Sequence, residues 1–399
     1  MKRFFSLLLL IYMFPVLAQA ETGPLSPQMN QLREQGFSAL FNMNYAASKK
    51  TFEEMIALEP RHPAGYIYLA NAIWLNYLAS LRRLQSNVYN RSNLFYKDSK
   101  DVEVDPTVDS SFHENIDKGI LHAEAELAAN KKNVAALYYL GLAKNISAGY
   151  EATVKRSFFS ALKNGSKGVE LHKEVLKQDP AFIDAGLSVG MYDYIAGSLP
   201  FGVKVLAFLG GVHGSKKNGL ELLTRVYQDG NYARDEAGAI LLMLNNREGN
   251  LETSLKLVTE LSARYPGNLF FALEKAGSLS NLKRYTEANQ QFESLLKNSD
   301  AMSYMADLIH FQYAESLVEE ESWEAAYQQY KAAAETPTAP ESLVTIARLE
   351  AGKCLDILGK REEAKAEYEK VLKRKDFMDS EDLAKKYLKR PYDPSEKED

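Results

Sequence analysis

The chain has 399 residues, 46% of them apolar and 25% charged, which is enough for two or three domains with a sizeable core. Its 23 glycines and 13 prolines make up about 9% of the residues, and this low share favours helices over a turn-rich β sandwich. A single cysteine excludes a disulfide framework and a multi-cysteine zinc site, and a net charge of −5 argues against nucleic acid as a partner.

The first twenty residues have the three parts of a secretory signal. Lys2 and Arg3 give a positive start, residues 4–17 are almost all apolar, and Ala18 and Ala20 are the small residues that a signal peptidase reads. We therefore predict cleavage after Ala20 and a periplasmic or secreted protein, with an uncleaved N-terminal anchor as the alternative. No cysteine follows the apolar run, which excludes a lipid-anchored lipoprotein.

No later segment predicts a stable membrane span after signal cleavage. Residues 182–211 come closest, but Asp184, Asp193 and Lys204 interrupt them with charges.

Residues 21–230 show a spacing of small, aromatic and proline residues that is typical of paired helices. Gly36, Phe52 and Pro60 follow one another as a small contact residue, an aromatic residue and a helix-ending proline. We expect residues 97–111, rich in Asp and Ser, to form a solvated loop. Second helices with glycine at the contact with the first helix are predicted from three similar tetrapeptides, which begin at Lys118, Lys167 and Asn218.

Residues 190–216 are the least repetitive part of the chain. Pro200 must interrupt a helix there, and Gly210 and Gly214 permit backbone conformations that are closed to other residues. The spacing does not fit the G-x-x-x-x-G-K-[ST] phosphate loop. We therefore predict a break at which two halves of the structure meet at an angle.

Residues 231–390 repeat a unit of 34 residues with occasional insertions of one helical turn. A small residue recurs at intervals of 34, 38 and 38, at Ser254, Ala288, Ala326 and Ala364. In an antiparallel helix pair this residue lets the two backbones approach, and the aromatic residue four positions later fills the space beside it. Because no single pair can bury its apolar face alone, the units are expected to stack.

The pattern resembles the tetratricopeptide repeat family, and the residues that carry it are Ala288, Phe292, Gly352, Gly359, Ala364 and Tyr368. Over roughly residues 110–300 the chain also resembles, more loosely, the inclusion body clearance family of tetratricopeptide proteins. The matching features are Leu199-Pro200, the apolar residues 203–209, the turn at 210–214 and Gly219-Leu220. Ser215-Lys216-Lys217 stands where that family usually has an acidic–basic pair. The resemblance implies a related solenoid and no particular activity.

We predict an all-α protein, a helix-hairpin solenoid or superhelix of about seven to eight repeats. Its expected parts are a signal peptide over 1–20, an N-terminal solenoid with extended helices over 21–230, a regular C-terminal solenoid over 231–390 and a disordered polar tail over 391–399.

The first helix of each pair lines the concave surface of such a solenoid, so a partner peptide is expected to lie there. Tyrosines suit that role because they offer a large area and a polar group, although most aromatic residues at helical spacing belong to the core. The groove positions of the resembled family include Gly277. The predicted partner-binding residues are Tyr138, Asn145, Tyr192, Asp193, Tyr194, Met243, Asn246, Arg247, Ser280 and Asn281.

The sequence contains no catalytic constellation, and we predict no enzyme activity, metal or cofactor. His113-Glu114 begins a zinc-protease motif, but Asp117 stands where H-E-x-x-H requires histidine. The G-x-S-x-G nucleophile elbow is missing, and Cys354 is expected to be a small buried hydrophobe.

The predicted function is that of an exported scaffold that binds an envelope protein or a peptide segment in its concave groove; a homo-oligomer is possible. Two alternatives stay open. An amphipathic small molecule could bind at the central break, between Tyr192, Tyr194 and a helix over 203–209, or a hydrolase could use carboxylates around Asp193.

Overall fold

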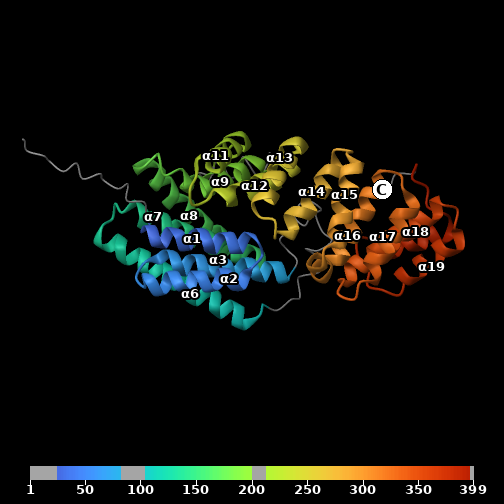
Figure 1. The fold of residues 1–399 in the computed structure, drawn as a ribbon, viewed down its shortest axis with the longest axis horizontal. Helices are drawn as coiled ribbons and strands as arrows, with labels where there is room; N and C mark the ends of the chain where they lie inside the picture. Colours follow the sequence, from blue (N-terminus) through green and yellow to red (C-terminus); the bar gives the residue numbers. More distant parts are fainter. Residues whose placement is uncertain (1–24, 82–103, 200–212, 396–399) are drawn as a thin grey trace, which may run out of the picture.

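The computed structural model describes residues 25–81, 104–199 and 213–395, and all regular structure within them is helical (Figure 1). This confirms the predicted all-α solenoid. None of the helices in these ranges has the length and apolar character needed to span a membrane. The predicted signal peptide and residues 203–209 lie outside the described residues.

The helices follow one another as hairpins, and we call the two members of each hairpin its first and its second helix. The N-terminal hairpins pair α1 (Pro27–Phe41) with α2 (Tyr45–Leu58), α3 (Pro63–Ser80) with α6 (Pro106–Ala129), α7 (Val134–Tyr150) with α8 (Phe158–Gln178), and α9 (Gly186–Ser198) with α11 (Lys216–Asp229). A π-helical turn, η2 (Glu151–Lys155), precedes α8, and a 3-10 turn, η3 (Ile183–Ala185), precedes α9.

The remaining hairpins continue the same order toward the C-terminus. They pair α12 (Arg234–Glu248) with α13 (Leu251–Arg264), α14 (Leu269–Asn281) with α15 (Tyr285–Lys297), α16 (Ser299–Glu319) with α17 (Trp323–Glu335), and α18 (Glu341–Ile357) with α19 (Arg361–Val371). Helix α20 (Ser380–Lys389) packs on α18 and α19 and closes the stack. The eight hairpins formed by the described residues agree with the predicted seven to eight repeats.

Helix α6 begins inside the predicted loop, so that prediction was wrong for residues 106–111. Asp105 accepts hydrogen bonds through Oδ1 from the backbone N–H groups of Thr107 and Val108, and Pro106 occupies the first helical position. A proline there begins a helix without loss, because its missing N–H would have no partner in the first turn.

At both ends of the solenoid, a glycine on the first helix of a hairpin packs against an aromatic ring on its second helix. A Cβ atom on Gly36 would lie 2.3 Å from Cε1 of Phe52, and one on Gly352 would lie 2.4 Å from Cε1 of Tyr368. Both rings are fully buried. Glycine is therefore required at these two contacts by the close approach of the ring.

The apolar core passes from hairpin to hairpin. One cluster of buried residues extends from Leu25 to Ala185, and another extends from Tyr194 to Cys354. Leu223 and Leu241 belong to the second cluster, so the core is continuous across residue 230. The division into two solenoids at that point stays a prediction. Cys354 is buried among apolar neighbours, as expected.

The solenoid curves until its first hairpins touch its middle (Figure 1). The ring of Phe41 stacks on that of Tyr265 with a centroid distance of 4.8 Å. The backbone N–H of Gly267 donates to Oδ1 of Asn42 at 2.9 Å, and the Tyr304 hydroxyl donates to the Ala79 carbonyl at 2.9 Å. Each of these two hydrogen bonds joins residues 225 positions apart in sequence.

The C-terminal end is held by one buried carboxylate. Oδ2 of Asp356 accepts hydrogen bonds from the Tyr368 hydroxyl and from the backbone N–H of Tyr392, both at 2.8 Å. Arg361 donates to Oδ1 of the same side chain at 2.8 Å. Tyr392 also packs edge-on against Tyr387. The segment predicted as a disordered tail therefore starts with an ordered contact.

Candidate functional site

The first helices of the N-terminal hairpins face inward onto a core of aromatic and charged side chains. Tyr138 on α7 is only 2% exposed, and its ring stacks on the imidazole of His172 at 5.2 Å. Phe182 and Tyr232 complete the surroundings of this ring. Burial removes Tyr138 from the set of residues that a partner can contact, which corrects the sequence prediction.

His172 is held as a neutral side chain in this core. Desolvation lowers its pKa to about 4. Because Nε2 lies 3.0 Å from the Tyr138 carbonyl, which can only accept, the proton is on Nε2. Nδ1 then accepts from the Ser188 hydroxyl at 2.7 Å. All polar atoms of the ring are engaged inside the protein, so His172 has a structural role.

Asp184 fixes the turn that leads into α12. Its Oδ1 accepts hydrogen bonds from the backbone N–H groups of Asn231, Tyr232 and Ala233, at 2.9, 2.7 and 2.8 Å. From the other side, Arg33 on α1 donates to the Asn231 carbonyl at 3.2 Å, and its guanidinium lies 4.7 Å above the Tyr232 ring. These contacts close the inner face between α1, α7 and α12.

Two other predicted residues join neighbouring helices. Tyr194 is 1% exposed, and its hydroxyl donates to Oε1 of Glu248 at 2.6 Å, which ties α9 to α12. Lys216 lies 2.8 Å from the same carboxylate and lowers its pKa. Asn145 packs against Gly168 of its own hairpin, where an added Cβ would lie 2.2 Å from the amide oxygen. Because Tyr194 is buried, a partner cannot contact its side chain, which corrects this prediction too.

Tyr192 and Asp193 are half-buried on α9. The ammonium group of Lys173 lies 4.6 Å from the centre of the Tyr192 ring. Burial raises the pKa of Asp193, and the charge of Lys173 opposes this shift. The neighbour that affects this carboxyl group is thus a cation, whereas a two-carboxylate hydrolase would need a second acid beside it.

The first helices α12, α14 and α16 leave an accessible surface, which we call the exposed first-helix face. Asn246 on α12 donates to Oε1 of Glu274 on α14 at 2.6 Å, so the two helices are neighbours there. Arg247 and Asn281 are exposed. A Cβ atom on Gly277 would meet nothing closer than the side-chain oxygen of Gln312 on α16, at 4.0 Å. The surface is open at its centre.

Two further predicted residues lie on the same helices but contribute less to this face. Met243 is half-buried and packs against the apolar core, and Ser280 is 8% exposed. Of the predicted residues, Arg247 and Asn281 are exposed, and Asn145, Tyr192, Asp193, Met243 and Asn246 are half-buried.

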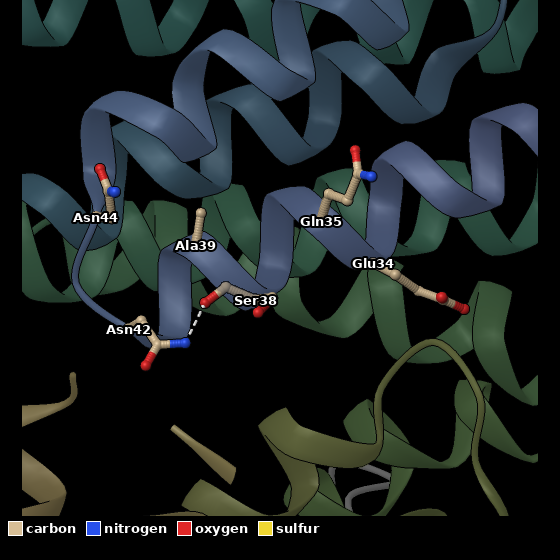
Figure 2. Close-up of a pocket in the computed structure, with 6 residues that line it drawn as sticks. All are labelled: Glu34, Gln35, Ser38, Ala39, Asn42 and Asn44. Carbon is tan, nitrogen blue, oxygen red and sulfur yellow. Dashed lines mark hydrogen bonds between the residues drawn. The ribbon is translucent and has the colours of Figure 1, made fainter. Parts of the chain in front are cut away.

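A shallow, open pocket along α1 was not predicted from the sequence (Figure 2). Its volume is about 540 Å³, and its lining residues are Glu34, Gln35, Ser38, Ala39, Asn42 and Asn44. Glu34, Ser38 and Asn42 are spaced by one helical turn, and the Asn42 amide donates to the Ser38 carbonyl at 2.8 Å. This spacing of polar residues is the signal that could have revealed the pocket.

The exposed first-helix face and the pocket along α1 both present hydrogen-bonding groups. They offer amides, a guanidinium group, a hydroxyl group and carboxylates, which suit the backbone and polar side chains of a peptide. Among residues 25–81, 104–199 and 213–395 there is no group of three or more His, Cys, Asp or Glu side chains placed to hold a metal ion.

Comparison with known proteins identifies the family. The family model described as Iml2/Tetratricopeptide repeat protein 39 matches residues 185–387. It confirms both resemblances seen in the sequence, to tetratricopeptide repeats and to the inclusion body clearance family, but the match begins and ends later than the predicted range of 110–300. No curated protein matches the chain.

Several solved structures are similar at low identity. A tetratricopeptide repeat protein from Parabacteroides merdae is 12% identical, with 81% of this chain and 99% of that chain covered and a TM-score of 0.31. The human IFIT1 dimer with m7Gppp-AAAA is 11% identical, with coverage of 92% and 86% and a TM-score of 0.42. Yeast Tom70 is 13% identical, with coverage of 90% and 87% and a TM-score of 0.29. Likeness at this level says nothing about function.

Proposed function

Because the chain belongs to the Iml2/Tetratricopeptide repeat protein 39 family, we propose that it is a non-enzymatic scaffold that binds a protein partner on its exposed first-helix face. The proposed partner is an envelope protein or a peptide segment of one, met in the periplasm of a Gram-negative bacterium after cleavage of residues 1–20. Helical-repeat scaffolds bind in this way because stacked hairpins present one continuous surface.

The observation that carries the proposal is the contrast between the two sets of first helices. In the N-terminal part, Tyr138 and His172 are engaged by the protein itself. In the C-terminal part, Gly277 on α14 is less crowded, since an added Cβ atom would have the side-chain oxygen of Gln312 on α16 as its nearest neighbour, at 4.0 Å. An extended peptide needs accessible hydrogen-bonding groups, and Arg247 and Asn281 on this face are exposed, whereas Asn246 and Glu274 are half-buried and bonded to each other.

Site-specific photo-crosslinking in intact cells of the source organism tests this proposal. A benzophenone amino acid at Asn281 or Arg247 on the exposed face is expected to give a discrete crosslinked product. The matched control carries the same amino acid at Lys256, which is exposed on the second helix α13. Equal products from Asn281 and Lys256, or none from Asn281 and Arg247, would show that the partner does not bind here.

A second variant separates blocking of the face from loss of the fold. Gly277→Trp adds a large side chain to this face of α14 and should abolish the Asn281 product while the helical circular dichroism stays unchanged. Mass spectrometry of the periplasmic protein tests the proposed location, since cleavage after Ala20 predicts a chain that begins at Glu21.

A further inference from the structure

Helix α8 carries an unusual exposed stripe on its first three turns. Phe158, Phe159 and Leu162 are 64%, 82% and 69% exposed, which is rare for side chains of this size. Lys163 and Lys167 continue the same stripe and are also exposed. We call these five residues the α8 stripe.

The stripe is formed by the way α8 packs. None of residues 158–167 is buried, whereas Gly168, Val169, His172 and Val175 further along the helix are. The opposite side of the first turns lies against α7, where a Cβ on Gly165 would be 3.5 Å from Ala148. The π-helical turn η2 and the left-handed Arg156, with φ of 55°, redirect the chain before α8 begins. The helix therefore has one face on the protein and one free face.

The sequence around the stripe is basic. Residues 152–169 contain four cationic residues and no acidic one, in a chain of net charge −5. Lys155 pairs with Asp109 at 3.1 Å and Lys167 with Glu170 at 3.4 Å, and both pairs are at least partly exposed. Lys163 stands beside Leu162 on the exposed face. Aromatic and aliphatic groups next to lysines on one helix face are typical of segments that lie in a membrane interface.

We propose that the α8 stripe docks on an anionic lipid bilayer. Phe158, Phe159 and Leu162 would enter the boundary between headgroups and acyl chains, while the lysines would contact lipid phosphates. The bilayer is favoured over a protein occupant because apolar side chains and lysines lie along one exposed helix face, with no acidic residue between them. This inference concerns a different surface from the exposed first-helix face and does not depend on partner binding there.

Vesicle co-sedimentation tests the proposal with the protein purified after expression in bacterial cells. Vesicles of phosphatidylglycerol and phosphatidylethanolamine are compared with vesicles of phosphatidylcholine. We expect binding to the anionic vesicles that falls about tenfold or more in the double variant Phe158→Ser and Phe159→Ser, because two large apolar groups no longer enter the lipid. Lys163→Ala should weaken binding about fivefold.

Leu121→Ser is the matched control for Leu162→Ser. Leu121 on α6 is 63% exposed, close to the value for Leu162, but lies outside the stripe. Only Leu162→Ser should weaken binding, and neither exposed substitution should change the thermal unfolding midpoint. Absence of binding to anionic vesicles, or equal binding by the wild type and the double Phe variant, would overturn the proposal. If the double Phe variant instead converts a dimer to a monomer in light scattering, a second copy covers the stripe and the membrane proposal is wrong.

Discussion

At the scale of single residues, Asp184 does most to fix the position of the turn before α12. One carboxylate oxygen accepts hydrogen bonds from three consecutive backbone N–H groups of the turn that precedes α12. The residue is 4% exposed, so water cannot replace it. Such a buried acceptor fixes the direction in which the next hairpin leaves.

Replacing Asp184 with Ala should therefore lower the free energy of unfolding by about 2–3 kcal/mol, because three backbone donors, of which the Ala233 N–H is buried, lose their acceptor. Asp179→Ala is the control. Its Oδ1 accepts a hydrogen bond from the Ala181 N–H at an exposed position, and the loss of this bond should cost about 1 kcal/mol or less. Urea unfolding of the two variants measures the difference, and equal losses would contradict the role assigned to Asp184.

Because of His172, the free energy of unfolding is expected to depend on pH in the acidic range. Its pKa of about 4 in the folded protein lies below the usual 6.5, so the unfolded chain binds the extra proton between these values. The contribution of neutral His172 is complete above about pH 6.5 and falls as the pH is lowered toward 4, by up to about 3 kcal/mol. His172→Gln should remove this part of the pH dependence, and the exposed His213→Gln should not. Urea midpoints measured from pH 7.5 to 4.5 check the prediction, and parallel curves for wild type and His172→Gln would refute it.

At the scale of the helix, the same substitution is expected to have opposite effects at two glycines. Gly277 lies in α14 where an added Cβ atom would not be crowded, so Gly277→Ala should stabilise the protein by up to about 1 kcal/mol through helix propensity. Gly352 lies in α18 against the Tyr368 ring, so Gly352→Ala should destabilise it by about 1–3 kcal/mol through overpacking. The midpoint of denaturant unfolding measures both changes. A loss of stability in Gly277→Ala would show that the exposed first-helix face is not open.

The periodic spacing of small and aromatic residues predicted the hairpins because packing within a hairpin is local. Gly352 and Tyr368 lie on the first and second helix of one hairpin, so their contact forms within a single repeat. The burial of Tyr138 and Tyr194 could not be predicted in the same way. Their environments depend on Phe182, Tyr232 and Glu248, which come from other hairpins. The same chemistry that makes tyrosine suitable for a groove makes it suitable for a polar core.

At the scale of the whole molecule, the closure of the N-terminal part decides which surface stays available. The contacts that close it are hydrogen bonds at the ends of helices, such as those from Asn268 to the Phe41 carbonyl and from Gly267 to Asn42. No repeat period encodes a contact over 225 residues, which is why the sequence predicted an open groove along the whole chain. In the structure, the first helices of the N-terminal hairpins pack against other parts of the protein, whereas α12, α14 and α16 leave part of their surface accessible.

An engineered disulfide between positions 42 and 267 tests this closure most directly. A Cβ atom on Gly267 would lie 3.3 Å from Cβ of Asn42, close to the separation that a disulfide needs, and the buried Cys354 thiol, whose pKa is raised to about 12, does not compete. The double variant Asn42→Cys and Gly267→Cys should form an intramolecular disulfide in nearly every molecule on mild oxidation, while Asn42→Cys with Lys256→Cys should not. Free thiols at both positions of the first variant in the folded protein would contradict the closed arrangement.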